Sequence, residues 1–384
     1  MKSSVRRKNV LRSVIRLIAV GCLGTAAAFA PSHSFAVTIT MQALSSFGSS
    51  GWLQPSAFPG VTGTNNVIRS IAFNPVTGSL LYANGSSIIP VNASTGAIGT
   101  AITGTATTGG TVKLNTVAVT SDGVIYGSNL TTNSTTDPFK VYRWASQSSG
   151  TTVSYIGNAG LGGSRVGDDI AIFGADSGGS LAFGFSNSPV VTGNNSFSVV
   201  STGAVGSASA VTYTGGTAGA FRLGITFADA DTVLGTQGSA TIRRVSFLGT
   251  SGTLDGSNTL NTTNERGILY FSAYGTPLLA TIVTGSGSSM NTVRLYDATN
   301  LATTGTATYL TQLNLASTSS NANANANGSI TFGTVNDTPT LYALNTNNGI
   351  QAIQLVPEPS TVAVAGICSL GLAAVMLRRR GRQA

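Results

Sequence analysis

Short apolar runs that alternate with polar residues fill positions 37–356, and stretches rich in Gly, Asn, Ser and Thr separate them. Alternation with a period of two predicts β-strands that bury one face. Glycine-containing turns such as Pro75–Gly78 and Ser121–Gly123 predict tight hairpins, because glycine tolerates a positive φ. None of these positions belongs to a sustained helical period. The pattern therefore predicts an all-β body.

A unit of strand, tight turn, strand, polar turn and strand recurs along this body. Its six copies begin at Ile68, Leu114, Asp169, Phe221, Arg266 and Gly328. A period of about 45 to 60 residues with three or four strands is typical of propeller blades. We therefore predict a β-propeller of six or seven blades, with the residues before Ile68 as candidates for the seventh. The segment Val37–Leu44 would pair with the last unit and close the ring. The alternative is a β-solenoid, whose rung is about half this length.

Charge changes the picture only at the two ends. The 384-residue chain has a formal net charge of +8, but the Lys and Arg excess lies before residue 37 and after residue 356. The body between them is nearly neutral. Nucleic-acid binding needs clustered Lys and Arg on the working surface, so we expect no nucleic-acid partner.

Residues 1–36 have the order of an export signal. A basic stretch that ends at Arg16 precedes the apolar run Leu17–Ala30, and Ser34–Ala36 supplies small residues for a signal peptidase. We predict cleavage after Ala36. Three alternatives stay open: an uncleaved anchor helix, an imperfect lipoprotein box that ends at Cys22, and an imperfect twin-arginine signal at positions 6–7.

Cleavage of the export signal would remove the single histidine and one of the two cysteines from the mature protein. His33, the single histidine, and Cys22 lie inside it, and Cys368 lies in the C-terminal apolar run. The mature body would then contain neither His nor Cys. This excludes disulfides, Cys/His zinc sites, Ser-His-Asp triads and Cys-His dyads from the body.

The C-terminal segment 356–384 has the order of a membrane anchor. Residues 361–377 carry no charge, and as a helix they would be just long enough to cross a thin bilayer. The basic tail 378–384 follows, and Arg378, Arg379 and Arg380 would hold the end of the chain on the cytoplasmic side. Pro357 and Pro359 cannot continue a helix, so they predict an extended, accessible stretch before the span.

"VPEPS" at positions 356–360, a short apolar helix and an arginine-rich end together resemble the PEP-CTERM sorting signal of Gram-negative bacteria. This resemblance implies recognition by an exosortase, a membrane cysteine transpeptidase, in systems that accompany exopolysaccharide production. Pro357, Glu358 and Pro359 would be the recognition triplet and Arg378–Arg380 the stop-transfer cluster. The expected partners are signal peptidase, exosortase, the inner membrane in passing, and exopolysaccharide. The protein would cross the inner membrane as an anchored precursor and reach the cell surface or the medium.

The body also resembles a family of exported bacterial propeller-like proteins. The similarity is carried by Val112–Trp144 and Ser164–Ala175, and by "ITFADADTVLG" and "VRLYDATNL". It implies a fold for residues 37–355 but no activity. Within that body, the low-complexity stretch 317–329, "STSSNANANANGS", predicts a mobile loop between blades.

Two acidic pairs are the candidates for chemistry in the body: Asp168 with Asp169, and Asp229 with Asp231. Carboxylates so close together can bind Ca²⁺ or act as the acid and base of a glycosidase. Asp is also common at turns, where it caps backbone N–H groups, and that structural role is the favoured interpretation. We expect no cofactor, with calcium as the alternative.

Arginines and aromatic residues are the candidates for binding. Five arginines could line the mouth of the propeller and bind an anionic sugar, or form interblade ion pairs: Arg165, Arg222, Arg243, Arg244 and Arg266. Six aromatic residues could stack on sugars, or pack between blades: Trp52, Trp144, Tyr82, Tyr126, Tyr142 and Tyr270.

Two functional hypotheses follow. The first is an exosortase-sorted surface or matrix protein whose non-catalytic propeller binds polysaccharide or protein. The second is a carbohydrate-active propeller enzyme that acts on exopolysaccharide. The missing His and Cys and the sorting tail favour the first.

Overall fold

The computed structural model describes residues 38–358, except positions 103, 105–106, 161–162, 187–194, 216–218, 238–240, 260–263 and 286–287. The export signal with Ala36, and Pro359 with the predicted span 361–377 and the arginines 378–380, lie outside the described residues. Within the described part of the chain, no helix is long and apolar enough to cross a membrane. The body, Ile39–Glu358, forms one compact unit.

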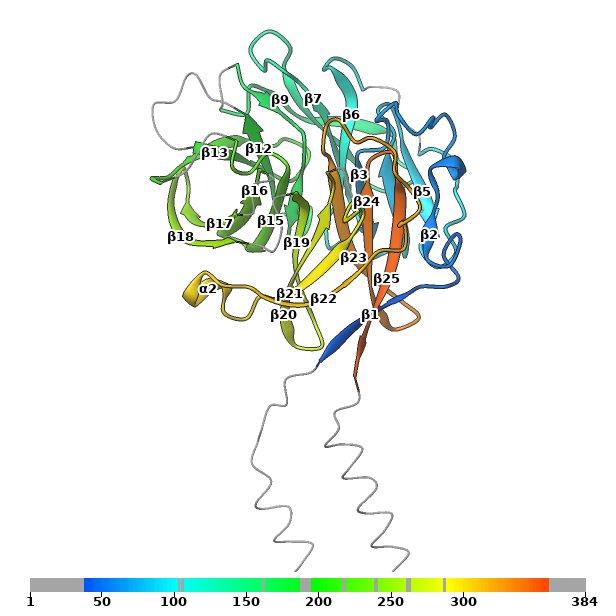
Figure 1. Cartoon of the computed structure of the whole chain (residues 1–384). Helices are drawn as coiled ribbons and strands as arrows, with labels where there is room; N and C mark the ends of the chain where they lie inside the picture. The colour runs from blue at the N-terminus through cyan, green and yellow to red at the C-terminus, as the bar shows by residue number, and fades with distance from the viewer. Residues whose placement is uncertain are drawn as a thin grey trace, which may run out of the picture. The chain divides into compact units, whose positions relative to one another are not determined.

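Strands dominate the body and follow one another as antiparallel meanders (Figure 1). The first is β3 (Ser70–Asn74), β4 (Ser79–Ala83) and β5 (Ile88–Asn92). The second is β6 (Val112–Val119), β7 (Ile125–Leu130), β8 (Phe139–Trp144) and β9 (Thr151–Gly157). The third is β11 (Ala171–Phe173), β12 (Ser180–Ser186), β13 (Asn195–Ser201) and β14 (Ala208–Thr212), with β10 (Arg165–Val166) beside β12.

Three more meanders complete the described body. The fourth is β15 (Gly224–Asp229), β16 (Thr232–Thr236), β17 (Thr241–Leu248) and β18 (Ser251–Thr259). The fifth is β19 (Glu265–Ala273), β20 (Thr276–Val283), β21 (Val293–Asp297) and β22 (Thr308–Leu313). The sixth is β23 (Gly328–Val335), β24 (Thr338–Asn345) and β25 (Gly349–Pro357). A single parallel pair between β14 and β18 joins the third and fourth meanders into one sheet. Short helical turns, η1 (Pro55–Ala57) and α2 (Leu301–Thr304), lie in connections.

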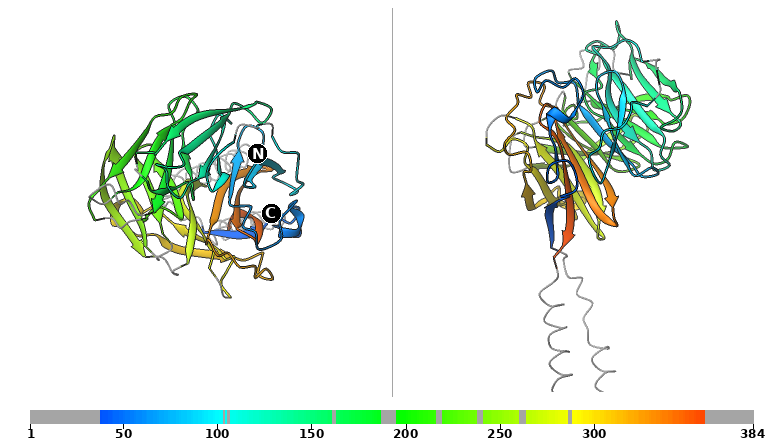
Figure 2. Two further views of the ribbon diagram at one scale, coloured as in Figure 1. Left: turned by 90° about the horizontal axis from the view of Figure 1, so that it is seen from above. Right: turned by 90° about the vertical axis from the view of Figure 1, so that its right-hand side faces the viewer.

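The first strands of the meanders form a closed ring. Each contacts the next in the order β3, β6, β11, β15, β19 and β23, and β23 contacts β3 again. The view from above shows the meanders arranged around a common centre (Figure 2). The prediction of an all-β, propeller-type body is confirmed. A solenoid would leave the first and last units apart, whereas here they touch.

The N-terminal strands of the body complete the sixth meander. β1 (Ile39–Ala43) pairs antiparallel with β25 over its whole length, from Ile39 opposite Pro357 to Ala43 opposite Ile353. β2 (Trp52–Leu53) also pairs with β25. The residues before Ile68 therefore join the last sheet and do not form a separate one. This pairing of the two ends of the body covers an edge that would otherwise be exposed.

The hydrophobic core is divided among the interfaces between neighbouring meanders. Apolar side chains of the second and third meanders, such as Tyr126, Phe139 and Phe183, form one buried cluster, and each of the other five neighbouring pairs encloses another. Each sheet has two apolar faces, so it is stable only when a neighbour covers each face. The aromatic candidates Trp144, Tyr82, Tyr126 and Tyr142 are buried in these clusters, so their role is packing.

One glycine sets the position of the segment that precedes β15. A Cβ on Gly184 of β12 would lie 1.8 Å from the backbone oxygen of Phe221. Only glycine permits this approach, and it brings the backbone of Phe221 and Arg222 against β12.

The low-complexity stretch 317–329 connects β22 to β23, and its last residues belong to β23. It is a connection between two meanders, and several of its asparagines form hydrogen bonds. Asn323 Nδ2 donates to Asn345 Oδ1 at 2.6 Å, and Asn321 Nδ2 donates to the backbone oxygen of Asn347 at 2.7 Å. Amide side chains both donate and accept, so a run of asparagines can bind a neighbouring asparagine-rich turn.

Candidate functional site: the arginine-rich entrance

A polar residue stands within a few residues of the start of each first strand of the ring. The six residues, in chain order, are Arg69, Asn115, Asp168, Arg222, Arg266 and Asn327. Since these positions correspond to one another in successive meanders, they gather at one end of the ring's centre. We call this set, together with Arg165 of β10, the arginine-rich entrance.

Asp168 lies at the middle of the entrance with a side chain that is not exposed. Arg165 binds it with two hydrogen bonds, Nη2 to Oδ1 at 2.5 Å and Nε to Oδ2 at 2.7 Å. Arg222 Nε donates to Oδ2 at 2.8 Å. Burial alone would raise the pKa of Asp168, but Arg165 and Arg222 outweigh it and hold the pKa below its ordinary value. Asp168 is therefore a fixed negative charge.

Arg69 is the most buried cation of the entrance, with 6% of its side chain exposed. Its Nη2 lies 3.9 Å from Asp168 Oδ1. In the amide orientation that satisfies both groups, the side-chain oxygen of Asn327 accepts from Arg69 Nη2 at 2.7 Å and Nε at 2.8 Å. Burial lowers the pKa of Arg69, Asp168 raises it, and Arg165 and Arg222 lower it further. Asn327 thus ties the loop before β23 to the entrance.

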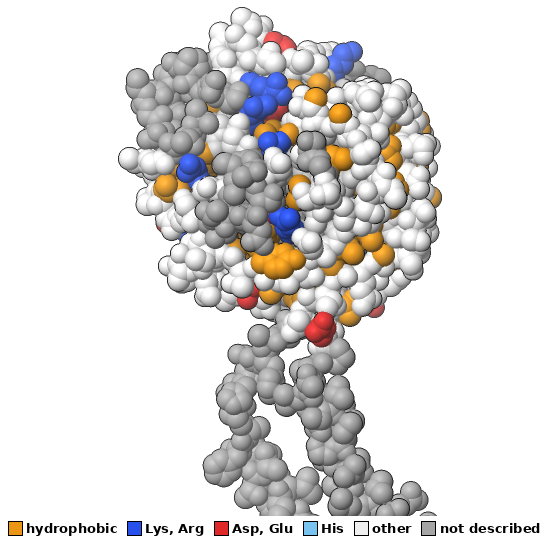
Figure 3. Space-filling model, in the orientation of Figure 1, with side chains coloured by type: hydrophobic (Ala, Val, Ile, Leu, Met, Phe, Trp, Pro, Cys, Tyr) orange, Lys and Arg blue, Asp and Glu red, His pale blue; other side chains and the backbone are white. Residues whose placement is uncertain are grey.

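Positive charge is in excess at the entrance. Arg69, Arg165 and Arg222 share the carboxylate of Asp168, and Arg266 lies near Arg222 without an acidic partner among the described residues, in a body that is otherwise nearly neutral. Other arginines of the body have their own carboxylates: Arg143 with Asp176, Arg244 with Asp255 and Arg294 with Glu265. On the face shown in Figure 3, Lys and Arg side chains form several separate patches between its upper part and its middle. A local excess of guanidinium groups attracts anions.

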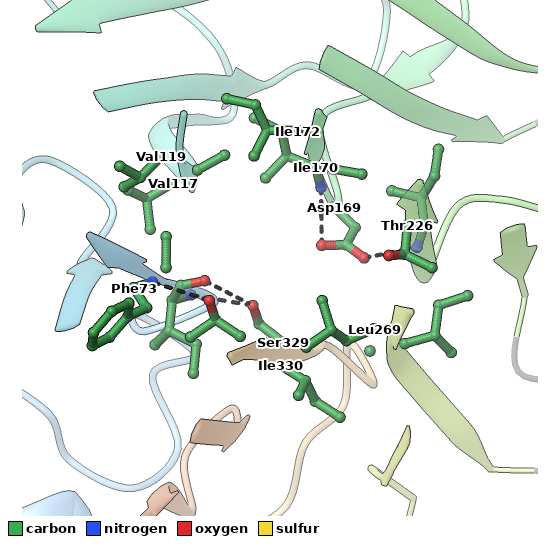
Figure 4. Close-up of a pocket in the computed structure, with 18 residues that line it drawn as sticks. Phe73, Val117, Val119, Asp169, Ile170, Ile172, Thr226, Leu269, Ser329 and Ile330 are labelled. Atoms are coloured by element: carbon green, nitrogen blue, oxygen red, sulfur yellow. Dashed lines mark hydrogen bonds between the residues drawn. The ribbon is translucent and has the colours of Figure 1, made fainter. Parts of the chain in front are cut away.

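Beneath the entrance, the centre of the ring is a narrow channel. A cavity of about 100 Å³ is lined by a short stretch from each first strand, such as Ile71–Phe73 of β3 and Val117–Val119 of β6. Asp169 projects into it, with Thr226 and Ser329 on other walls (Figure 4). A cavity of this size holds a few water molecules, whereas ligand pockets begin at about 300 Å³.

Asp169 forms no ion pair within the described part of the chain. Its oxygens accept from the backbone N–H of Ile170 at 2.9 Å and of Ile225 at 3.1 Å. Burial raises the pKa of Asp169 to about 7, and the charge of Asp168 adds to this, while the two backbone donors oppose it. Adjacent carboxylates in the chain therefore have opposite pKa shifts, because one faces guanidinium groups and the other faces the channel.

A larger pocket of about 730 Å³ lies beside the entrance, with Arg266 in its wall. Asn264 lies beside Arg266, and the loop before β23 supplies most of the remaining lining, including Ser317, Ser319 and Asn323. This volume falls in the range of about 300–1000 Å³ that is typical of small-ligand sites. Hydroxyl, amide and guanidinium groups are the donors and acceptors that a sugar requires.

The structure does not bring the two predicted acidic pairs together. Asp229 and Asp231 lie at the exposed turn between β15 and β16, where Asp229 Oδ1 accepts from the backbone N–H of Asp231 at 3.0 Å. Asp168 is held by guanidinium groups, which repel a cation. Among the described residues, no three acidic, His or Cys side chains are grouped as metal ligands. The residues present do not fit the calcium site that the sequence left as an alternative.

The predicted arginine set is divided by the fold. Arg165, Arg222 and Arg266 reach the entrance, but Arg243 and Arg244 lie on β17, the third strand of its meander. Sequence reasoning missed Arg69, Asn115 and Asn327. A signal was present, because each stands two or three residues before an Ile or Val at the start of a repeated unit. Aligning the units on that apolar residue would have revealed the entrance.

Comparison with known proteins supports the fold alone. No protein-family model matches the chain, and no curated protein matches it. Among solved structures, a DUF4623 family protein from Bacteroides eggerthii aligns with a TM-score of 0.61 at 16% identity, over 84% of this chain and 75% of that one. A gluconolactonase from Xanthomonas campestris aligns with a TM-score of 0.45 at 11% identity, over 77% of this chain and 88% of that one.

Proposed function

We propose that this chain is an exported, exosortase-sorted surface protein whose propeller binds polysaccharide at the arginine-rich entrance and catalyses no reaction. The observation that carries the binding proposal is the position of Arg266. It lies in the wall of a pocket of about 730 Å³ that is otherwise lined mainly by Ser, Asn and Ala. Such a lining can hydrogen-bond sugar hydroxyls, and the neighbouring arginines attract a polymer that carries acidic groups.

Binding to the cell's own surface polysaccharide is the direct test. We expect the purified full-length protein to bind it in isothermal titration calorimetry, and the affinity to fall as salt is raised, because screening weakens the arginines' attraction. Reducing ends should not increase during prolonged incubation. Absence of binding would contradict the proposal, and accumulation of reducing ends would contradict its non-catalytic part.

A carbohydrate-active enzyme is the second candidate, and Asp169 is the observation that favours it. A carboxyl group whose pKa is raised to about 7 can act as a general acid near neutral pH. Glycosidases, however, need two carboxyl groups that flank the bond to be cleaved. Asp168 is already ion-paired with Arg165 and Arg222. The cavity around Asp169, at about 100 Å³, is smaller in volume than a site that holds a sugar. Product formation that Asp169→Asn abolishes would support this candidate.

Sorting by the C-terminal segment is proposed on the resemblance of residues 356–384 to the PEP-CTERM signal. The described part of that segment suits recognition, since Pro357 and Glu358 are exposed at the end of β25. Deleting residues 359–384 leaves β25 and its pairing with β1 intact. We expect the deletion to release the precursor from the membrane fraction, as followed by immunoblotting of fractionated cells.

A point variant separates recognition from anchoring. Glu358→Ala should leave the precursor in the membrane fraction but slow its conversion to the processed form, because the apolar run is unchanged. If the truncated protein stays with membranes as the intact one does, the segment is not the anchor.

A further inference from the structure

Arg266 differs from the other arginines of the entrance in having no acidic partner among the described residues. Arg165 and Arg222 bind Asp168, and Arg69 lies near it. The Nε of Arg266 is buried and has no hydrogen-bond partner in the described part of the chain. Burial lowers the pKa of Arg266, and the nearby charge of Arg222 lowers it further. An uncompensated guanidinium of this kind is destabilising unless an anion binds it.

Glu265, which precedes Arg266 in the chain, does not form an ion pair with it. Glu265 is fully buried and accepts hydrogen bonds from Arg294 Nη1 at 2.7 Å and from the Tyr296 hydroxyl at 2.7 Å. Because Glu265 belongs to this network within the fifth meander, it is not available to neutralise Arg266. The guanidinium of Arg266 therefore lines the pocket without a neutralising carboxylate among the described residues.

Hydrogen bonds already order the part of the pocket wall that the loop before β23 supplies. Asn323 donates to Asn345, and Asn345 Nδ2 donates in turn to Asn291 Oδ1 at 2.6 Å. Thr284 Oγ1 donates to the backbone oxygen of Ala326 at 3.1 Å. These bonds fix the loop before β23, which lines the same pocket as Arg266. A wall that is already ordered loses little conformational entropy when a ligand binds.

We propose that Arg266 is the residue that recognises a carboxylate, so that the pocket selects acidic sugars, such as uronic acid units, over neutral ones. The inference rests on the proposed function and adds the class of polysaccharide. A guanidinium presents two parallel N–H donors that match a carboxylate, and charge-assisted bonds of this type are the strong ones. Ser317, Ser319 and Asn323 supply donors and acceptors for the hydroxyls of the same sugar or of the next one.

The test compares acidic oligosaccharides with the same oligosaccharides after their carboxylates are reduced to alcohols. Oligomers of galacturonate, glucuronate and alginate serve as probes, with the purified full-length protein. We expect the wild-type protein to bind at least one acidic oligomer about tenfold or more tightly than its reduced form. Arg266→Gln should lose that preference, and Arg266→Lys should keep part of it. Lys140→Gln, which removes one charge from β8 outside the entrance, is the matched control and should bind like the wild type.

The possible failures are distinguishable. Equal affinity for acidic and reduced oligomers would overturn the inference and leave polysaccharide binding standing. An unchanged preference in Arg266→Gln would overturn the assignment to Arg266. Binding to neither form, together with no binding to the cell's own polysaccharide, would overturn the proposed function as well. We expect Arg266→Gln to melt at or above the wild-type temperature, because it removes an uncompensated charge, so a loss of preference would not reflect unfolding.

Discussion

Replacing Asp168 with alanine is expected to lower the free energy of unfolding by about 3 kcal/mol or more, as is usual when one partner of a buried ion pair is removed. Asp168 is ion-paired with Arg165 and Arg222 and lies 3.9 Å from Arg69, and its side chain is fully buried. Arg165 and Arg222 are about one quarter exposed and can turn to water, but Arg69, at 6% exposed, cannot. Urea denaturation followed by intrinsic fluorescence gives the free energy directly.

Two comparisons give this prediction its specificity. Asp231→Ala, at the exposed turn after β15, should change the stability by less than about 0.5 kcal/mol. Sulfate should raise the melting temperature of Asp168→Ala more than that of the wild type, because an anion can replace the missing carboxylate between the arginines. Equal stabilities of Asp168→Ala and Asp231→Ala would show that the entrance does not depend on this charge.

Replacing Asp169 with asparagine is expected to flatten the dependence of stability on pH. The pKa of Asp169 is raised from 3.8 to about 7 in the folded protein. The unfolded chain therefore releases this proton at a lower pH than the folded one, and folding loses stability as pH rises from about 4 to about 7. The wild type should lose about 2–3 kcal/mol between pH 5 and pH 8 through this one group. Asparagine is neutral at both values, so the variant should gain stability relative to the wild type at the higher pH.

The measurement is the free energy of unfolding at both pH values for each protein. Ser329→Ala is the control, because it alters the same channel without removing a titrating group, and it should keep the wild-type difference between the two pH values. If Asp169→Asn and the wild type lose the same stability on going to pH 8, the carboxyl group is already ionised at low pH and the channel is better hydrated than its lining indicates.

The all-β architecture was predictable because it depends on local patterns. Short apolar runs such as Ile68–Asn74 favour a strand wherever that strand is placed, and glycine in "PVTG" permits a hairpin without help from distant residues. The six predicted units begin within a few residues of the six first strands. The pairing of Val37–Leu44 with the last unit was also predictable, since the first and last edges of a ring need each other.

The site was predictable only in part, because its residues come from six units spread over most of the chain. Arg165, Arg222 and Arg266 were candidates alongside Arg243 and Arg244, which the fold places on a third strand. Charge alone cannot show which of these arginines lie at the entrance, since all five stand between short apolar runs. An arginine reaches the entrance only if it lies near the strand of its meander that faces the centre of the ring. The packing of the sheets determines which strand that is.

The sequence by itself determined the strands, their turns, the recurrence of the unit and the near-neutral charge of the body, because each of these depends on residues within a few positions of one another. Only the tertiary structure decided that Arg69 and Asn327 join the entrance and that Arg266 has no acidic partner among the described residues. It also decided that the pKa of Asp168 is lowered while the pKa of Asp169 is raised to about 7. These properties arise from burial and from charges that meet only when the first and last meanders close the ring.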